Sequence, residues 1–205
     1  MFRHRHAKRS RGQALVEFAL AGTLIFTLLS AAVDLGLIFF SLQALRVAAQ
    51  EGASFGSHPV MVMNGADVLA VDLPYAQIVD RVRRSGGDAP RGIVNLLDLN
   101  NDGVDDSTQG GNLLTYNDPN SYIYIQNLKY VSDALYDPTT GAPLTPSTCA
   151  TNLPRQQMRG AGQFCYVKVT VSYDYKFIFP LAPVFGSSVR LKTSFLIHVR
   201  SSFIG

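Results

Sequence analysis

The sequence lacks features that several protein classes require. Its two cysteines are too few for a small domain held together by several disulfides, and its 47% hydrophobic composition is too high for a disordered chain. It contains no GxSxG, HExxH, GxxxxGK[ST] or CxxC motif, and two of its four histidines fall within the first six residues. We therefore expect the 205 residues to form one folded domain plus an appendage, without enzymatic activity.

Acidic residues are absent from the first twelve positions, which hold five of the 18 basic residues. These five are Arg3, Arg5, Lys8, Arg9 and Arg11. The rest of the chain carries 13 basic against 15 acidic residues. Because the excess of positive charge is confined to a short leader, we expect no general nucleic-acid-binding surface and no nucleic-acid partner.

A long apolar run follows the leader at residues 18–40 and is interrupted only by Asp34. As an α-helix these 23 residues would reach about 35 Å, which suffices to cross a hydrocarbon core of about 30 Å. The positive-inside rule places the basic leader in the cytoplasm and the bulk of the chain outside. The sequence therefore predicts a membrane-inserted start.

This start has three alternative fates. A cleaved signal peptide would use the small residues at 30–32 and leave a mature chain that begins at Val33. An uncleaved signal anchor would keep Met1. A prepilin-type leader would be cut between Gly12 and Gln13, before the apolar run, so that the whole helix stays in the mature protein.

Glu17 favours the third fate. It lies at the membrane edge and would be the fifth residue of a chain that begins at Gln13. An ionised carboxylate near hydrocarbon is costly unless it has a partner. Cleavage creates such a partner, the new α-amino group of Gln13, on the same or a neighbouring subunit. The small Gly12 would let an extended backbone enter a protease site without a side-chain clash.

These residues resemble the start of the TadE-like pseudopilins of the tight-adherence (Flp, type IVb) pilus system. The similarity lies in the basic leader, Gly12 and QALVEFAL at 13–20, and it continues through VDLG at 33–36, QAL at 43–45 and AAQEGA at 48–53. Residues 167–175 and 179–181 look like the family's carboxy-terminal hairpin. About residues 60–160 carry no signature of the family.

The resemblance implies a minor pilin or pseudopilin that crosses the bacterial cytoplasmic membrane once. The partners that it implies are a prepilin peptidase cutting after Gly12, other pilins or pseudopilins, and an inner-membrane assembly platform. Assembly would proceed by helix packing, with Glu17 setting the register between subunits by charge pairing. The alternative is a signal-anchored or secreted calcium-binding domain unrelated to pili.

Asp34 allows two interpretations. A carboxylate within a membrane segment is by default a functional site, here one that pairs with a partner subunit during assembly. Asp34 also lies only about 10 Å along the helix from the end of the apolar run, close enough to the outer interface to be hydrated. Both environments remain open at this point.

The helix should continue past Phe40, because residues 41–51 are rich in strong helix formers, and it should stop near Ser57-His58-Pro59. Ala48, Gly52 and Gly56 are spaced four residues apart on one face of this extension. Such a ladder of small residues would let either another helix or the protein's own globular domain approach closely.

We predict an α+β fold in three parts: a cytoplasmic leader at 1–12, a transmembrane and extended helix at 13–56, and an exported domain at 57–205. The exported domain should contain a short helix at 72–84 and a β-rich segment at 122–125. Strands are predicted at 166–175 and 189–199, where apolar and polar residues alternate as in a half-buried antiparallel sheet. The apolar loop between them would either fold back on the core or contact the bilayer or another pilin.

Residues 98–106 reproduce the start of an EF-hand calcium loop, with oxygen-bearing side chains at the first, third and fifth positions and glycine at the sixth. The predicted ligands of a weak, structural Ca²⁺ are Asp98, Asn100, Asp102 and the carbonyl of Val104, with Asp106 or its neighbour Asp105 completing the set. The twelfth position holds Gln109 where an EF-hand has a bidentate Glu. The same composition also favours a plain Asp/Asn/Gly-rich turn.

Cys149 and Cys165 have fifteen residues between them. Outside the cytoplasm such a pair usually forms a disulfide. Closing a loop of this size would stabilise the fold by roughly 3 kcal/mol in the chain-entropy model. We expect no zinc site, because no second Cys or His pair has suitable spacing.

Overall fold

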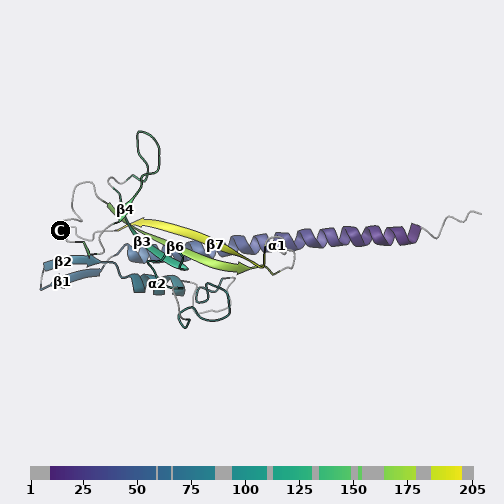
Figure 1. Cartoon of the computed structure of the whole chain (residues 1–205), viewed down its shortest axis with the longest axis horizontal. Coiled ribbons are helices and arrows are strands. Elements are labelled where there is room, and N and C mark those ends of the chain that lie inside the picture. Colours follow the sequence, from purple (N-terminus) through teal and green to yellow (C-terminus); the bar gives the residue numbers. More distant parts are fainter. Residues whose placement is uncertain are drawn as a thin grey trace, which may run out of the picture.

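The computed structural model of the chain describes residues 10–58, 60–65, 67–85, 94–109, 113–130, 134–148, 152–153, 164–178 and 186–199. A long helix, α1 (Ser10–Gly56), projects far beyond a domain of strands and a shorter helix that lies against its carboxy-terminal half (Figure 1). The predicted α+β class with an amino-terminal apolar helix is confirmed.

α1 continues without a break from the apolar run into residues 41–56, as predicted. No proline interrupts these 47 residues, and alanine and leucine are frequent among them. At the end of the helix the Ser57 N–H donates to the Ala53 carbonyl at 2.9 Å, and the Ser57 hydroxyl donates to the Ser54 carbonyl at 2.7 Å. Pro59 comes next in the sequence and disfavours helical backbone at His58.

Within the described residues, the larger sheet is antiparallel and has the strand order β4-β3-β6-β7. Its strands are β3 (Ile123–Tyr130), β4 (Ser147–Thr148), β6 (Phe164–Lys176) and β7 (Ser188–His198). β6 and β7 pair from Tyr166 opposite His198 to Lys176 opposite Ser188, so the two strands predicted at 166–175 and 189–199 are neighbours. Because β6 lies between β3 and β7, its polar residues Thr170 and Ser172 are buried as well.

A smaller antiparallel sheet, β1-β2-β5, lies at the end of the molecule opposite the start of α1 (Figure 1). Its strands are β1 (Val60–Asn64), β2 (Asp67–Asp72) and β5 (Asn152–Leu153). The sequence analysis did not predict this sheet. The helix α2 (Tyr75–Arg84) begins three residues later than predicted, because β2 occupies the chain through Asp72 and Pro74 precedes the first turn.

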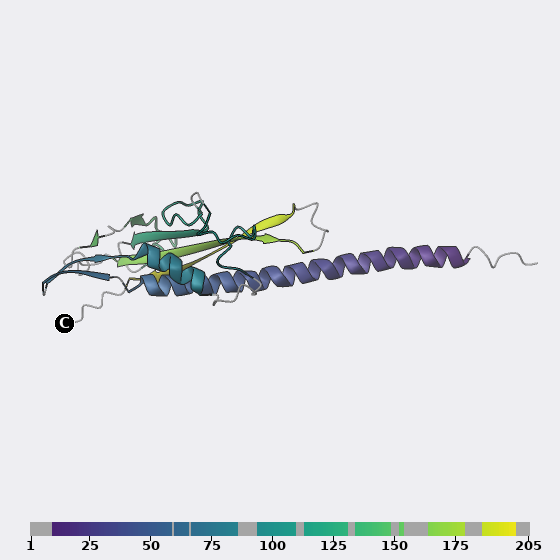
Figure 2. The same cartoon turned by 90° about the horizontal axis from the view of Figure 1, so that it is seen from below.

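The core lies between the larger sheet and the two helices, which cover the same face of that sheet (Figure 2). Where α1 meets α2 and β6, its buried residues are small. A Cβ added to Gly52 would lie 2.3 Å from Cγ2 of Val82, and one added to Gly56 would lie 2.8 Å from Cδ1 of Ile78. The small residues of α1 therefore pack closely against the protein's own domain, which confirms one of the two interpretations of the small-residue ladder.

Candidate functional site

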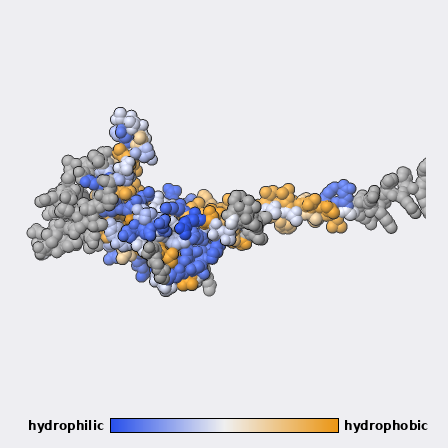
Figure 3. All heavy atoms as spheres, in the orientation of Figure 1, coloured by the Kyte–Doolittle hydropathy of each residue, from blue (hydrophilic) through white to orange (hydrophobic). Residues whose placement is uncertain are grey.

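The amino-terminal half of α1, residues 12–33, projects beyond the domain and is largely exposed. The face of this half that Figure 3 shows is mostly apolar. α1 is long and apolar enough to cross a membrane. At 1.5 Å per residue, this half spans about 33 Å, close to the thickness of a hydrocarbon core. Its large exposed side chains are Leu15, Val16, Phe18, Leu20, Leu24, Ile25, Phe26, Leu28, Leu29 and Val33.

The carboxy-terminal half of α1 is covered by the domain from Asp34 onward. Leu37 and Ile38 pack against the core, and Leu45 is fully buried. The stretch free of the domain is therefore 12–33, nearly two helical turns closer to the amino terminus than the apolar run at 18–40. Residues 34–40, the last part of the predicted apolar run, pack one face on the domain through Leu37 and Ile38.

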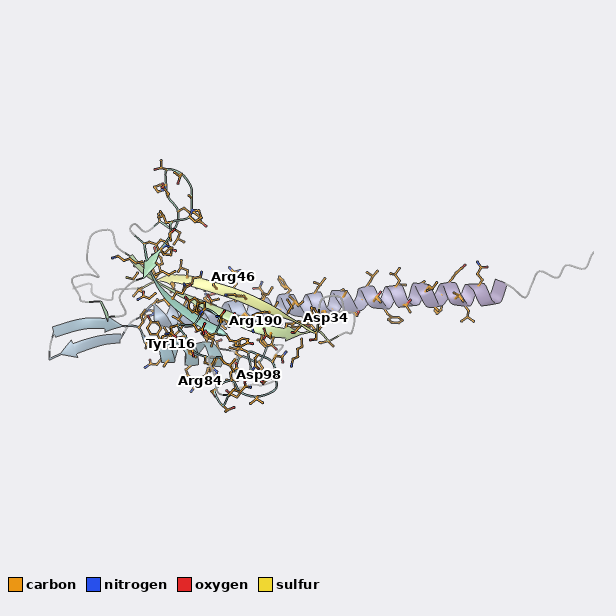
Figure 4. All side chains as sticks on the ribbon, in the orientation of Figure 1. Asp34, Arg46, Arg84, Asp98, Tyr116 and Arg190 are labelled. Atoms are coloured by element: carbon orange, nitrogen blue, oxygen red, sulfur yellow. The ribbon has the colours of Figure 1, made fainter. Side chains whose placement is uncertain are left out.

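Asp34 marks the boundary between the two halves and is only 7% exposed (Figure 4). Its Oδ1 accepts a hydrogen bond from the Tyr175 hydroxyl at 3.0 Å and another from the Ile178 N–H at 3.2 Å. Burial, followed by the bond to Asp34, raises the pKa of Tyr175 to about 12. Asp34 thus has partners in its own chain, at the turn end of the β6–β7 hairpin, an environment that the sequence analysis did not predict.

No sequence signal pointed to these partners, which lie 141 and 144 residues after Asp34. The first two residues of the loop after β6 differ in burial: Phe177 packs against the core, whereas Ile178 is 63% exposed. Residues 179–185 of the same loop lie outside the described part of the chain.

The predicted processing residues lie in the first turns of α1. A Cβ on Gly12 would meet nothing within 4 Å, and the Gln13 side-chain amide donates to Glu17 at 3.0 Å. The helix already includes Ser10, so Gly12 is helical rather than extended. Since the first four N–H groups of a helix have no intrahelical acceptor, this turn is the easiest part of α1 to open. Residues 1–9 of the leader lie outside the described range.

Residues 98–106 form a loop that is closed by its own side chains. The Asp98 carboxylate accepts the N–H groups of Asp102 at 3.0 Å and Gly103 at 2.8 Å. Asn100 Oδ1 accepts the Asp102 N–H at 3.0 Å, and Asp102 Oδ1 accepts the Val104 N–H at 2.9 Å. Gly103 has φ +95°, a conformation that favours glycine. The predicted ligand residues are thus gathered in one turn.

The far end of the loop departs from an EF-hand in the way that the sequence suggested. Gln109 donates through its amide nitrogen to Asp102 Oδ2 at 2.7 Å, so it acts as a donor where a Glu would act as a ligand. Across the described ranges, no three Asp, Glu, His or Cys side chains form a group that could hold a metal ion by themselves.

Asp106 differs from the other loop acids because it is almost completely buried, with 2% of its surface exposed. Its Oδ2 accepts the Leu99 N–H at 2.7 Å. Its Oδ1 is buried without a hydrogen-bond donor among the residues that the structure describes. Burial raises the pKa of Asp106, and the nearby charges of Asp98 and Asp102 raise it further.

The loop is fixed to two elements of the domain. Arg83 on α2 forms an ion pair with Asp105. At the end of β6, the Asp174 N–H donates to the Leu99 carbonyl at 2.9 Å, and the Asp174 carbonyl accepts the Asn101 side-chain amide at 3.1 Å. The loop therefore belongs to the folded core of the domain and is not a free appendage.

A cluster of Tyr122, Asp174 and Arg190 lies beside this loop and was missed by the sequence analysis. Arg190 Nε donates to Asp174 Oδ1 at 2.7 Å, and the Tyr122 hydroxyl donates to Asp174 Oδ2 at 2.5 Å. The Arg190 guanidinium lowers the pKa of Asp174. One sequence signal could have identified this cluster. Asp174 and Arg190 carry opposite charges on the two strands of the predicted hairpin, and they are paired in its register.

Of the two cysteines, Cys165 lies half-buried on β6 and Cys149 lies outside the described residues. Thr148, the residue before Cys149, pairs with Leu128 on β3, and Leu128 in turn pairs with Tyr166 on β6. Cys165 lies on β6, and β4, which ends one residue before Cys149 in the sequence, is separated from β6 by β3 alone. The disulfide stays a prediction.

Comparison with known protein families matches residues 12–54 to the family described as TadE-like protein. This segment is TadE-like. The match covers α1 almost completely, from the predicted processing residue Gly12 to two residues before the end of the helix. Searches of curated proteins and of solved structures found no match to the chain.

The TadE-like segment associates the protein with a tight-adherence pilus system and with the partners of such a system in general. It contains Glu17 and Asp34 and runs through residues 30–32, where a signal peptide would be cut. It stops before the first strand, so the resemblance of residues 167–175 to the family's carboxy-terminal hairpin stays a prediction.

Proposed function

We propose that this protein is a minor pilin or pseudopilin of a tight-adherence pilus system. α1 would be inserted in the cytoplasmic membrane through residues 12–33, with the basic leader inside and the α+β domain outside. The observation that carries the proposal is that the TadE-like match coincides with α1. The matched segment includes the exposed half of the helix, which is long enough to cross a membrane, and most of the half that packs against the domain.

The same coincidence argues against removal of the first half. Cleavage after Ala32 would leave the domain contacts intact, because they begin at Asp34. A protein that needed only those contacts would need no similarity to a pilus-system family before Val33. The match begins at residue 12 and extends across this point without interruption.

Processing would take place between Gly12 and Gln13 after the first turn of α1 opens. A prepilin peptidase is the partner for this step. Cleavage would free the α-amino group of Gln13 four residues before Glu17, on the side of the helix where the Gln13 side chain already reaches the Glu17 carboxylate. The new cation would compensate Glu17 at the membrane edge, within its own chain or between neighbouring subunits.

Assembly would use the face of α1 that the domain leaves uncovered. Leu35, Phe39, Phe40 and Val47 lie on the domain half of the helix and are each about half or more exposed. They extend the apolar surface of residues 12–33 beyond the membrane boundary. Helices of other pilins, and the inner-membrane assembly platform, are the partners that would cover this face.

Intact mass of the protein isolated from a host with a prepilin peptidase tests the proposal. We expect a mature chain that begins at Gln13, and we expect Gly12→Leu to retain the leader because a bulky residue blocks the protease site. Gly22→Leu is the matched control, since a Cβ at either glycine meets nothing within 4 Å; it should be processed normally.

A chain that begins at Val33 would contradict the proposal and favour a secreted domain unrelated to pili. A chain that keeps Met1 in the wild type would favour a plain signal anchor. Normal maturation of Gly12→Leu would refute the assigned cleavage position.

A further inference from the structure

The loop at 98–106 has no part in the pilus proposal, and one of its atoms lacks a partner. Asp106 is 2% exposed, and its Oδ1 has no hydrogen-bond donor within the described residues. Folding buries a carboxylate oxygen at a cost in free energy unless a donor or a cation meets it. The other oxygen of this carboxylate is held by the Leu99 N–H, which turns the group toward the start of the loop.

The surroundings of Asp106 favour a cation over a hydrogen-bond donor. Asp98 and Asp102 belong to the same loop, and their carboxylates accept its backbone N–H groups. Two basic residues contact the loop: Arg83 forms an ion pair with Asp105 through Nη2 and keeps a buried Nε without an acceptor in the described residues, and Lys176 donates to the Asn101 carbonyl. Against these two cations the loop carries four carboxylates, Asp98, Asp102, Asp105 and Asp106, which leaves an excess of negative charge.

The donor atoms indicate which cation fits. Residues 98–106 offer carboxylate, amide and carbonyl oxygens and contain neither histidine nor cysteine. Hard oxygen donors select Ca²⁺ or Mg²⁺ over zinc and copper. An irregular set of six or more oxygens in a flexible loop suits Ca²⁺, whereas Mg²⁺ requires near-octahedral geometry and keeps several waters.

We propose that residues 98–106 bind one Ca²⁺ ion, with Asp106 Oδ1 as the buried ligand. Asp98, Asn100, Asp102 and the Val104 carbonyl would complete the set. Asn100 Oδ1 and Asp102 Oδ1 each accept one backbone N–H, so each keeps a lone pair for the metal.

The site would stabilise the end of the domain that meets the membrane boundary. The loop holds α2 through Arg83 and the end of β6 through Asp174, and the next residue of β6, Tyr175, binds Asp34. Figure 4 shows Asp98 and Asp34 at this end of the domain. The inference does not depend on the pilus proposal, since calcium binding is a property of the loop alone.

Thermal unfolding of the full chain in a neutral detergent tests the site. After treatment with EDTA, we expect 10 mM CaCl₂ to raise the Tm by about 5 °C, as for a site with the millimolar or somewhat tighter affinity of extracellular modules. The same concentration of MgCl₂ should give less than a third of that shift. Asp106→Asn should abolish the calcium shift, yet melt at or above the wild-type Tm in EDTA, because it removes an uncompensated buried charge.

Asp137→Asn is the matched control. Asp137 accepts the Thr139 N–H at 2.7 Å in an exposed turn remote in sequence from the loop, so its variant should keep the full calcium shift. Should Asp106→Asn fail to fold, Asp102→Asn decides the question, because Asp102 is exposed and its substitution spares the core. Its calcium affinity should fall at least tenfold, measured as calcium displacement of tyrosine-sensitised Tb³⁺ luminescence.

The proposal is overturned by the absence of a calcium shift in the wild type, by an equal shift with MgCl₂, or by an undiminished shift in Asp106→Asn. Unchanged calcium affinity in Asp102→Asn would overturn it as well. None of these results would bear on the start of the mature chain, so the pilus proposal is judged separately.

Discussion

The two halves of α1 belong to one continuous helix and differ in their surroundings. Residues 12–33 carry large apolar side chains that no other part of the described chain covers. Residues 34–56 bury one face against α2, β6 and β7, and much of that face consists of alanine and glycine. Where the helix lies closest to the domain, its residues are small.

This difference indicates what each half is built to meet. Lipid conforms to a helix of any shape, so large side chains can point in all directions. A folded domain has a fixed surface, and close approach to it requires small residues. Asp34 stands where one environment gives way to the other, held by two donors from the β6–β7 hairpin.

The largest expected effect comes from a substitution that disrupts the packing of residues 34–56 of α1 on the domain. Gly52→Leu should lower the free energy of unfolding by about 3 kcal/mol, because even a Cβ at this position would lie 2.3 Å from Val82. Urea unfolding of the detergent-solubilised chain, followed by near-UV circular dichroism, measures it. Gly22→Leu places the same side chain on the uncovered half and should stay within about 0.5 kcal/mol of the wild type. Equal losses in the two variants would refute the contrast.

An intermediate effect is expected at the boundary. Asp34→Ala should cost about 2 kcal/mol, because the Tyr175 hydroxyl and the Ile178 N–H both lose a charged acceptor. Tyr175→Phe should cost about half as much, since the Ile178 N–H keeps its partner. In the double variant the two losses should fall short of additivity by about 1 kcal/mol. Full additivity in the same urea experiment would show that Asp34 and Tyr175 act independently.

Of the variants considered, one at Glu17 should change the stability of the fold least, yet strongly reduce assembly. Glu17→Ala should change the free energy of unfolding by less than about 0.5 kcal/mol, because Glu17 is exposed on the uncovered half. Cleavage should proceed normally, while the pilin accumulates in the membrane fraction and is lost from fibres. Glu51→Ala, an exposed glutamate of the seated half, should assemble normally. Incorporation of the Glu17 variant at the wild-type level would refute the charge-pairing role.

The sequence predicted β6 and β7 of the larger sheet and the first part of β3, but neither β4 nor any strand of the smaller sheet. Alternation in residues 166–175 and 189–199 identified the β6–β7 hairpin because one face of each strand meets the core. β1 and β2 are joined at Asn64-Gly65, a dipeptide typical of tight hairpins, so the sequence carried a signal for this pair that the sequence analysis overlooked. β5 joins them through the pairing of Leu153 with Val71, 82 positions apart, which no local pattern encodes.

The candidate sites show the same division. The motif in residues 98–106 identified the loop, since EF-hand spacing is local, and the leader and Glu17 were evident for the same reason. The burial of Asp106 and the partners of Asp34 were not evident, because each depends on where distant segments pack.

The sequence by itself determined the basic leader, a helix long enough to cross a membrane, and the alternation that makes β6 and β7 strands. Those properties are sums or periods over neighbouring residues, so they are present before the chain folds. Only the tertiary structure decided that the uncovered part of α1 ends at Asp34, that Gly52 and Gly56 seat α2, and that one oxygen of Asp106 is buried without a donor. Each of these depends on which surface the fold brings against a residue, and apolar side chains look alike in sequence whether lipid or protein covers them.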